Sequence, residues 1–123
     1  MIEHTDDVDA YVRLSNAYER MGNIYIGRRD AEGAEPYILK CYDIRKKLIG
    51  IYRSAERIQN LAYSCDKLGL IYRALGDTKK SKRYYLECKE LSDGFKHCKL
   101  KCNEPVASFK MYCYYIPLFY SQL

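Results

Sequence analysis

Four residues near the carboxyl end of the chain are of types that bind zinc. They are His97, Cys98, Cys102 and Cys113, which offer one imidazole and three thiol groups. Their spacing differs from the two close ligand pairs that complete most tetrahedral zinc sites. We therefore expect no metal site and no cofactor, and we keep a zinc-binding or redox role of this segment as the alternative function.

The chain has few groups that act as acid–base catalysts. Its two histidines, His4 and His97, lie near opposite ends of the sequence. Phosphate-binding loops, Ser-centred elbows and paired-histidine motifs are absent from the sequence. Catalysis needs a nucleophile, a base and a stabilising group that converge on one site. The sequence therefore predicts a protein that is not an enzyme.

The distribution of charge argues against a nucleic-acid partner. The net charge is +5, and residues 94–123 carry four lysines against one glutamate, so that the rest of the chain is nearly neutral. The largest basic cluster in that remainder is read as a solvated helix face rather than a phosphate-binding patch. It consists of Lys79, Lys80, Lys82 and Arg83, beside Asp77.

The cysteines and the amino-terminal residues indicate the compartment. Three of the six cysteines, Cys41, Cys65 and Cys88, lie inside apolar periodic segments, where a small buried thiol is sufficient. The acidic start, residues 1–9, has no apolar run of the kind found in signal peptides. We expect reduced cysteines, no integral membrane segment and a cytoplasmic location.

The sequence repeats itself with an offset of 47 residues, as from Leu14 to Leu61. In each copy apolar residues recur at intervals of three and four, which is the spacing of an amphipathic helix. The first helices carry stripes such as Leu14, Tyr18, Met21 and Tyr25. The second helices carry two further stripes: Ala34, Tyr37, Ile38, Cys41, Ile44 and Leu48 in the first copy, and Ser81, Tyr84, Tyr85, Cys88 and Leu91 in the second.

Each copy contains a break between its two helices. The breaks begin at Gly27 and at Leu75-Gly76, and in each we expect the glycine to end a helix in a left-handed conformation. Asp30 and Asp77 then accept N–H groups at the start of the next helix. The sequence therefore predicts two helical hairpins, at about residues 8–51 and 54–95, in a repeat region that spans residues 1–95.

A glycine recurs in the middle of each first helix, at Gly22 and Gly69. A mid-helix glycine costs about 1 kcal/mol relative to alanine, so its recurrence at one register needs a reason. Without a side chain, the first helix can approach the second closely at that level. A tyrosine three residues later, Tyr25 or Tyr72, is then expected to pack over the contact.

These spacings resemble the tetratricopeptide pattern W-x2-L-G-x2-Y followed by A-x3-F. The second copy reads Cys65-x2-Leu68-Gly69-x2-Tyr72 and then Ser81-x3-Tyr85; the first reads Tyr18-x2-Met21-Gly22-x2-Tyr25 and then Ala34-x3-Ile38. The resemblance covers about residues 10–95 and is similar to bacterial arrays with extended helices. It implies an all-α fold, in which antiparallel helical hairpins stack as a short α-solenoid.

The resemblance also implies a function. In such arrays the first helices line a concave groove that binds a peptide or a helical segment of another protein. We expect a protein-interaction scaffold with a groove of mixed charge, and Glu19 and Asp66 argue against a clamp for a carboxylate. The expected groove residues are Asn16, Glu19, Arg20, Asn23, Tyr63, Asp66, Lys67, Leu70 and Arg73.

The carboxyl-terminal segment, residues 96–123, departs from the repeat pattern. Its apolar stretch, residues 106–123, is too short to span a bilayer and contains Pro117. We interpret it as an atypical tail that contains a degenerate capping helix packed on the preceding helices. The alternatives are a contact with another chain, such as a homodimer formed through its aromatic residues, and a remnant of truncation without a selected role.

Overall fold

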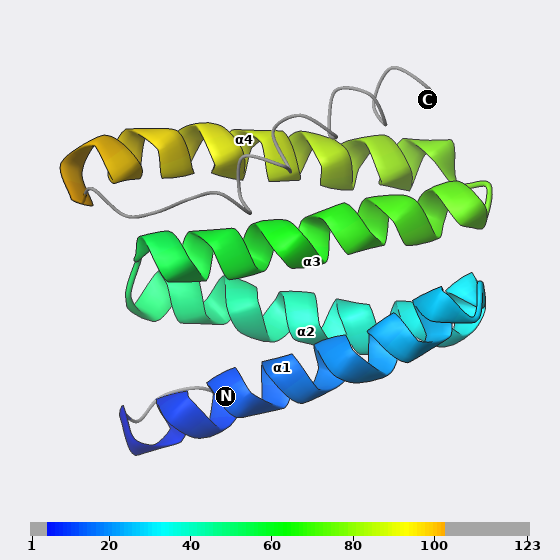
Figure 1. Cartoon of the computed structure of the whole chain (residues 1–123), viewed down its shortest axis with the longest axis horizontal. Helices are drawn as coiled ribbons and strands as arrows, with labels where there is room; N and C mark the ends of the chain where they lie inside the picture. The colour runs from blue at the N-terminus through cyan, green and yellow to red at the C-terminus, as the bar shows by residue number, and fades with distance from the viewer. Residues whose placement is uncertain (1–4, 103–123) are drawn as a thin grey trace.

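The computed structural model of the chain describes residues 5–102, and describes side chains for residues 7–93. This part of the chain forms four helices and no strand: α1 (Thr5–Gly27), α2 (Ala31–Ile51), α3 (Ala55–Ala74) and α4 (Thr78–Cys102). Successive helices run antiparallel and lie side by side (Figure 1). The predicted all-α fold class is confirmed.

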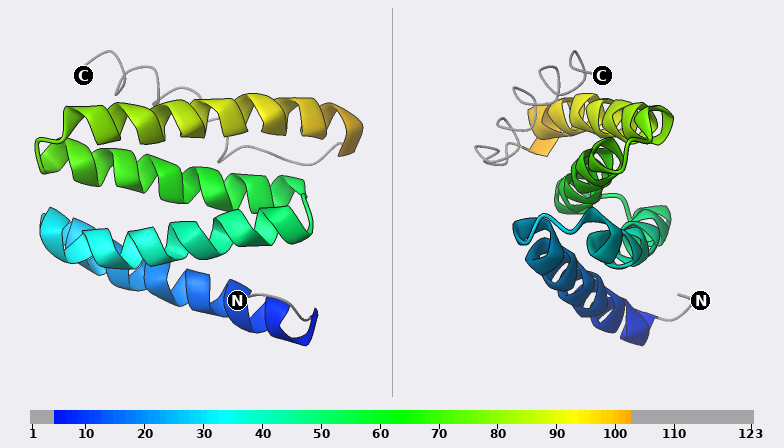
Figure 2. Two further views of the ribbon diagram at one scale, coloured as in Figure 1. Left: turned by 180° about the vertical axis from the view of Figure 1, so that it is seen from behind. Right: turned by 90° about the vertical axis from the view of Figure 1, so that its right-hand side faces the viewer.

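The two hairpins stack in chain order. α1 packs against α2, α2 against α3, and α3 against α4. Seen along the helices, the four elements follow a zigzag rather than closing into a bundle (Figure 2, right). This arrangement is the short α-solenoid that the repeat predicted, because each helix contacts mainly its neighbours in sequence.

Polar side chains cap three of the helices at their amino ends. The side chain of Asp30 accepts a hydrogen bond from the backbone N–H of Gly33 at 2.9 Å, and Asp77 accepts one from Lys80 at 3.1 Å. Ser54 caps α3 in the same way. Each cap satisfies a backbone donor that has no partner inside the helix, and the two predicted aspartate caps are confirmed.

The turn between α1 and α2 differs from the prediction. Gly27 is the last residue of α1, and the left-handed position falls on Arg29, with a φ of 59°. The equivalent residue of the second copy is Gly76, whose φ is 83°. The glycine prediction is therefore correct for the second hairpin and wrong for the first, where an arginine adopts a conformation that glycine tolerates better.

The recurring glycines lie where the helices of each hairpin approach most closely. A methyl group on Gly22 would collide with the Ile38 side chain, and one on Gly69 would lie 2.6 Å from the Tyr85 ring. Ile38 and Tyr85 are both fully buried. The predicted reason for the glycines, close approach of the first helix to the second, is confirmed.

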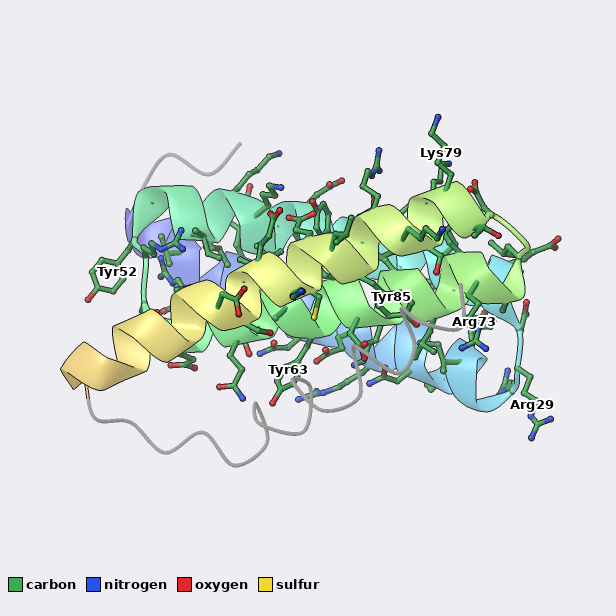
Figure 3. All side chains as sticks on the ribbon, turned by 90° about the horizontal axis from the view of Figure 1, so that it is seen from above. Arg29, Tyr52, Tyr63, Arg73, Lys79 and Tyr85 are labelled. Carbon is green, nitrogen blue, oxygen red and sulfur yellow. The ribbon has the colours of Figure 1, made fainter. Side chains whose placement is uncertain are left out.

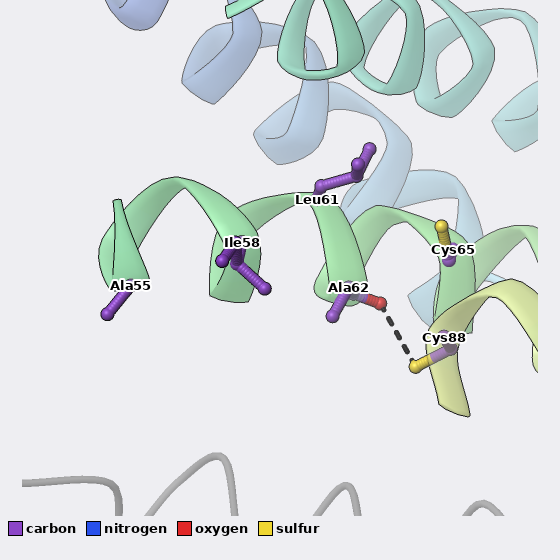
Figure 4. Close-up of a cluster of buried hydrophobic side chains, with 6 residues drawn as sticks. All are labelled: Ala55, Ile58, Leu61, Ala62, Cys65 and Cys88. Atoms are coloured by element: carbon purple, nitrogen blue, oxygen red, sulfur yellow. Dashed lines mark hydrogen bonds between the residues drawn. The ribbon is translucent and has the colours of Figure 1, made fainter. Parts of the chain in front are cut away.

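The core consists of two clusters. One joins α3 to α4 and includes the buried residues Leu61 and Cys65 of α3 and Cys88 of α4, whose thiol approaches the carbonyl oxygen of Ala62 at 3.4 Å (Figure 4). The other joins the hairpins and includes Ile38 of α2 and Leu68 of α3. The three cysteines of the repeats, Cys41, Cys65 and Cys88, are buried thiols outside any disulfide, as predicted.

Three details depart from the expected pattern. Leu14 and Met21 are exposed, because in the part of the chain that the structure describes no helix covers the outer face of α1. Proline is disfavoured in the interior of a helix, yet Pro36 lies inside α2, which begins at Ala31. α4 continues to Cys102, into the segment that the sequence assigned to the tail.

Within residues 5–102, no helix is long and apolar enough to cross a bilayer.

Candidate functional site

A cavity of about 400 Å³ lies between the two first helices, α1 and α3. The last turns of α2 and the connection to α3 complete its walls, and Tyr52 of that connection lies at one end of the molecule (Figure 3). Its lining residues are Asp9, Val12, Ser15, Arg45, Leu48, Tyr52, Ser54, Glu56, Arg57 and Asn60.

Arg45 of α2 lies beside this cavity and joins the three helices around it. Its guanidinium donates to both carboxylate oxygens of Glu19 on α1, each at 3.2 Å. It also donates to the side chain of Asn16 at 3.1 Å and to the backbone carbonyl of Asn60 on α3 at 2.9 Å. Lys67 of α3 reaches the same glutamate at 2.9 Å. Asn16, Glu19, Arg45 and Lys67 are called the Arg45 cluster below.

The electrostatics of the Arg45 cluster depend on burial. Only 4% of the Arg45 side chain is exposed, compared with 22% of the Glu19 side chain. Burial by itself raises the pKa of Glu19, but the hydrogen bonds and charges of Arg45 and Lys67 outweigh it and hold that pKa below its usual range. Glu19 is therefore ionised at neutral pH and neutralises Arg45, because a buried arginine requires a paired anion.

Three of the predicted groove residues, Asn16, Glu19 and Lys67, come together in the Arg45 cluster. They are tied to one another and to α2, and none of the three is among the residues that line the cavity. Two others, Arg20 and Asn23, are exposed on α1. These two are the predicted α1 residues that have accessible side chains.

The remaining predicted residues lie on α3. Asp66 and Arg73 lie three residues before and four residues after Gly69, which faces the Tyr85 ring, so they share the side of α3 that faces α4. Tyr63 and Leu70 are half-buried. Tyr63 and Arg73 extend from one side of the molecule and Lys79 from the other (Figure 3).

Asp66 differs in its surroundings from Glu19, its counterpart in the first copy. Burial raises the pKa of Asp66 to about 6, and Lys67 opposes that shift only partly. The residue equivalent to Arg45 is Ser92, which is buried and donates to the carbonyl of Cys88. The second hairpin therefore lacks the arginine that neutralises the carboxylate in the first.

The sequence reading missed Arg45, Arg57 and Asn60. Arg45 follows Cys41 by four residues and precedes Leu48 by three, so it lies within the apolar stripe of α2. A charged residue inside such a stripe is a signal that could have identified it, since arginine is rarely buried without a partner. The contribution of Asn60 is a backbone carbonyl, which no residue pattern reveals.

A second polar contact joins the hairpins through α2 and α4. Tyr42 donates to Glu87 at 2.8 Å, and Lys46 forms an ion pair with the same glutamate, also at 2.8 Å. Burial, together with Glu87, raises the pKa of Tyr42 to about 12, although Lys46 acts in the opposite direction. This contact fixes how the second helices of the two hairpins pack.

Metal binding and nucleic-acid binding receive no support from the described side chains. Among residues 7–93, no three His, Cys, Asp or Glu side chains are grouped in a way that could hold a metal ion. The candidate zinc ligands, from His97 onward, lie outside the described side chains, as does the predicted aromatic contact of the tail. The cluster from Lys79 to Arg83 is exposed apart from the buried Ser81, so its interpretation as a solvated face stays a prediction.

Comparison with known proteins agrees with this geometry. Two models of the tetratricopeptide repeat match the chain, one over residues 11–56 and the other over residues 62–94. No curated protein and no solved structure matches it. Tetratricopeptide repeats generally mediate protein–protein interactions, and the family is typically a non-enzymatic scaffold. From its two matched repeats and its two glycine-centred hairpins, we conclude that the chain belongs to the tetratricopeptide repeat family.

Proposed function

We propose that this protein binds a segment of another protein, in extended or helical form, in the groove between α1 and α3. The observation that carries the proposal is the cavity of about 400 Å³ between these two helices. Its walls combine apolar, aromatic and charged side chains, which is the usual composition of a site that recognises a side chain of a ligand. Arg20 and Asn23 extend the accessible polar surface along α1.

The Arg45 cluster supports the proposal by fixing the shape of the groove. A preformed site loses less conformational entropy on binding than one that must be ordered by its ligand. Arg45 holds α1, α2 and α3 together through one buried guanidinium, so the distance between the walls is set before a partner arrives. We therefore expect a rigid groove and a partner segment that adapts to it.

Peptide selection with the full chain as bait tests the proposal. Peptides from a random displayed library are selected, synthesised and titrated into the ¹⁵N-labelled protein. The expected result is that backbone signals of the groove move, chiefly those of residues 9–20 and 45–60. Asn60→Trp fills the cavity and is expected to weaken binding at least tenfold, whereas Lys89→Trp, at an exposed site on α4, leaves it unchanged.

Two results would overturn the proposal. One is that the selected peptides move signals of the protein only on the outer faces of α2 and α4. The other is unchanged binding by the Asn60→Trp variant, provided that its spectrum shows a folded protein. Either result means that the groove is not the binding surface.

A further inference from the structure

The two arginines that line the cavity are already engaged by the protein itself. Arg45 directs its terminal nitrogens to Glu19, Asn16 and the backbone of Asn60. Nη1 of Arg57 donates to the carbonyl oxygens of Leu48 and Tyr52, at 2.9 and 3.1 Å. These carbonyls belong to the end of α2, where the helix dipole is negative. Much of the positive charge of the cavity is therefore compensated from inside the fold.

The acidic residues of the cavity have no side-chain cation as a partner, although Glu56 lies in the first turn of α3, where the helix dipole is positive. Asp9 on α1 and Glu56 on α3 line the cavity from the two helices that face each other across it. Both are exposed. Within residues 7–93 neither carboxylate forms an ion pair or a side-chain hydrogen bond. The entrance of the cavity therefore has two negative charges that lack a cation.

The remaining lining is suited to a flexible apolar chain. Val12, Leu48 and Tyr52 contribute apolar surface to the same lining. A lysine or arginine side chain has a long apolar stem and a charged end, and it commonly packs the stem on apolar surface while the charge remains near water. The arrangement of apolar surface and carboxylates matches this kind of side chain.

One N–H donor of Arg45 is left unsatisfied by the described residues. Arg45 lines the cavity and is almost completely buried, yet its Nε has no hydrogen-bond partner among the described residues. A buried donor without an acceptor costs free energy, commonly 1–3 kcal/mol. Because Nε itself is buried, this cost belongs to the packing of the Arg45 cluster.

We propose that the cavity receives a lysine or arginine side chain of the partner segment, with its stem on Val12 and Leu48 and its charge between Asp9 and Glu56. The inference rests on the proposed binding of a protein segment in the groove and specifies the chemistry of one anchor. Charge complementarity with the two carboxylates distinguishes this occupant from an acidic segment.

Small blocked amino acids test the inference directly on the full chain. The probe is N-acetyl-lysine N-methylamide, titrated into the ¹⁵N-labelled protein. The matched probes are the norleucine derivative, which keeps the stem without the charge, and the glutamate derivative. We expect the lysine probe to move the signals of residues 9–15 and 48–60 and to saturate at millimolar concentration. Norleucine is expected to bind at least fivefold more weakly, and glutamate not at all.

Two substitutions provide the second measurement. The double variant Asp9→Asn with Glu56→Gln preserves the size of both side chains and is expected to raise the Kd of the lysine probe at least fivefold. The control is Asp43→Asn, an exposed carboxylate on α2 that does not line the cavity. It should leave the Kd unchanged, and the spectra of all variants report whether the fold is intact.

The outcomes separate this inference from the proposed function. Equal affinity for lysine and norleucine, binding of glutamate, or signals outside the cavity would show that the basic anchor is wrong. Selected peptides that still bind the groove would then leave the proposed function standing. If the lysine probe binds as expected but no peptide binds the groove, the proposed function fails and the cavity remains a site for basic side chains.

Discussion

Tyr25 of α1 and Tyr37 of α2 stack with their ring centroids 5.6 Å apart and their planes 10° from parallel. The equivalent pair of the second hairpin, Tyr72 and Tyr84, stacks at 5.6 Å and 12°. The 47-residue offset of the sequence is therefore reproduced as a repeated contact in space. Tyr42 adds an edge-on contact to Tyr84 at 5.4 Å and so connects the first hairpin to the second.

Replacing Gly69 with alanine is expected to destabilise the protein by about 1–3 kcal/mol, although alanine favours helices more than glycine does. The added methyl group would lie 2.6 Å from the ring of Tyr85, which is fully buried and cannot move aside. Gly22→Ala should also destabilise the protein, because the added methyl group would collide with the Ile38 side chain. Urea unfolding monitored by circular dichroism measures both changes.

Gly50 is the matched control for these glycine substitutions. It lies inside α2, it is exposed, and a methyl group there would meet no atom within 4 Å. Gly50→Ala should therefore stabilise the protein by up to about 1 kcal/mol. If all three substitutions change stability equally, the close approach of the helices is not what requires glycine at positions 22 and 69.

Glu19→Gln is expected to lower the free energy of unfolding by about 2–4 kcal/mol at pH 7. The substitution leaves the buried guanidinium of Arg45 without its anion, and an uncompensated buried charge is costly. The pKa of Glu19 is lowered, so its contribution is present above the unfolded-state pKa and is lost as the pH falls through the folded-state value. The destabilisation caused by Glu19→Gln should accordingly be smaller in acid.

Glu87→Gln provides the comparison for the Arg45 cluster. Its ion-pair partner, Lys46, is 56% exposed, and exposed pairs contribute less than about 1 kcal/mol. Chemical unfolding of both variants in one buffer gives the two values. A loss at Glu87 as large as that at Glu19 would contradict the assignment of Arg45 as the buried ion that holds the groove.

Asp66→Asn is expected to stabilise the protein at neutral pH but not in acid. The pKa of Asp66 is about 6 in the folded chain and its ordinary value is 3.8. Between these two pH values the folded state therefore binds more protons than the unfolded state. The free energy of unfolding consequently falls as the pH rises from about 4 to about 6. Removing the charge should recover roughly 1–2 kcal/mol above pH 6.

Thermal unfolding at pH 4 and pH 7 measures the effect of Asp66→Asn. Asp43→Asn, at an exposed position on α2, is the control and should change the melting temperature little at either pH. A gain from Asp66→Asn that is the same at both pH values would show that ionisation of this carboxylate is not the cause. Direct NMR titration of the Asp66 carboxyl group gives an independent value of its pKa.

Arg29→Gly is expected to stabilise the first hairpin by about 0.5–1 kcal/mol. A φ of 59°, as at Arg29, is sterically unfavourable for a residue with a side chain but not for glycine. The gain is partly offset because glycine loses more backbone entropy on folding. Gly76→Ala, at the equivalent turn, should have the opposite sign. Unfolding by urea distinguishes the two, and a loss from Arg29→Gly would mean that the arginine side chain stabilises its turn.

Much of the fold could be predicted because its determinants are local or repeated. Helical spacing, the aspartate caps and the position of the break depend on residues within one or two turns of each other. The 47-residue repeat places Gly22 and Gly69 at equivalent positions, so both could be assigned the same role in the close packing of the two helices of a hairpin. The left-handed position at Arg29 escaped prediction, because glycine marks it in only one of the two copies.

The candidate site was predicted only in part. Sequence spacing identifies residues that share a face of one helix, and on that basis Glu19 and Lys67 were assigned to the two first helices, where the structure pairs their side chains at 2.9 Å. The rotation of α3 about its own axis determines whether Asp66 faces α1 or α4, and that rotation is set by how Leu61, Leu68 and Gly69 pack against two neighbours.

The sequence by itself determined that the chain forms two helical hairpins of one family, because short-range spacing and an internal repeat suffice for that. Only the tertiary structure decided which polar residues line the cavity between α1 and α3. Arg45 joins residues from three helices, and Asn60 contributes through its backbone carbonyl. Contacts of this kind depend on the packing distance and rotation of whole helices. The spacing of residues within a single helix does not specify either quantity.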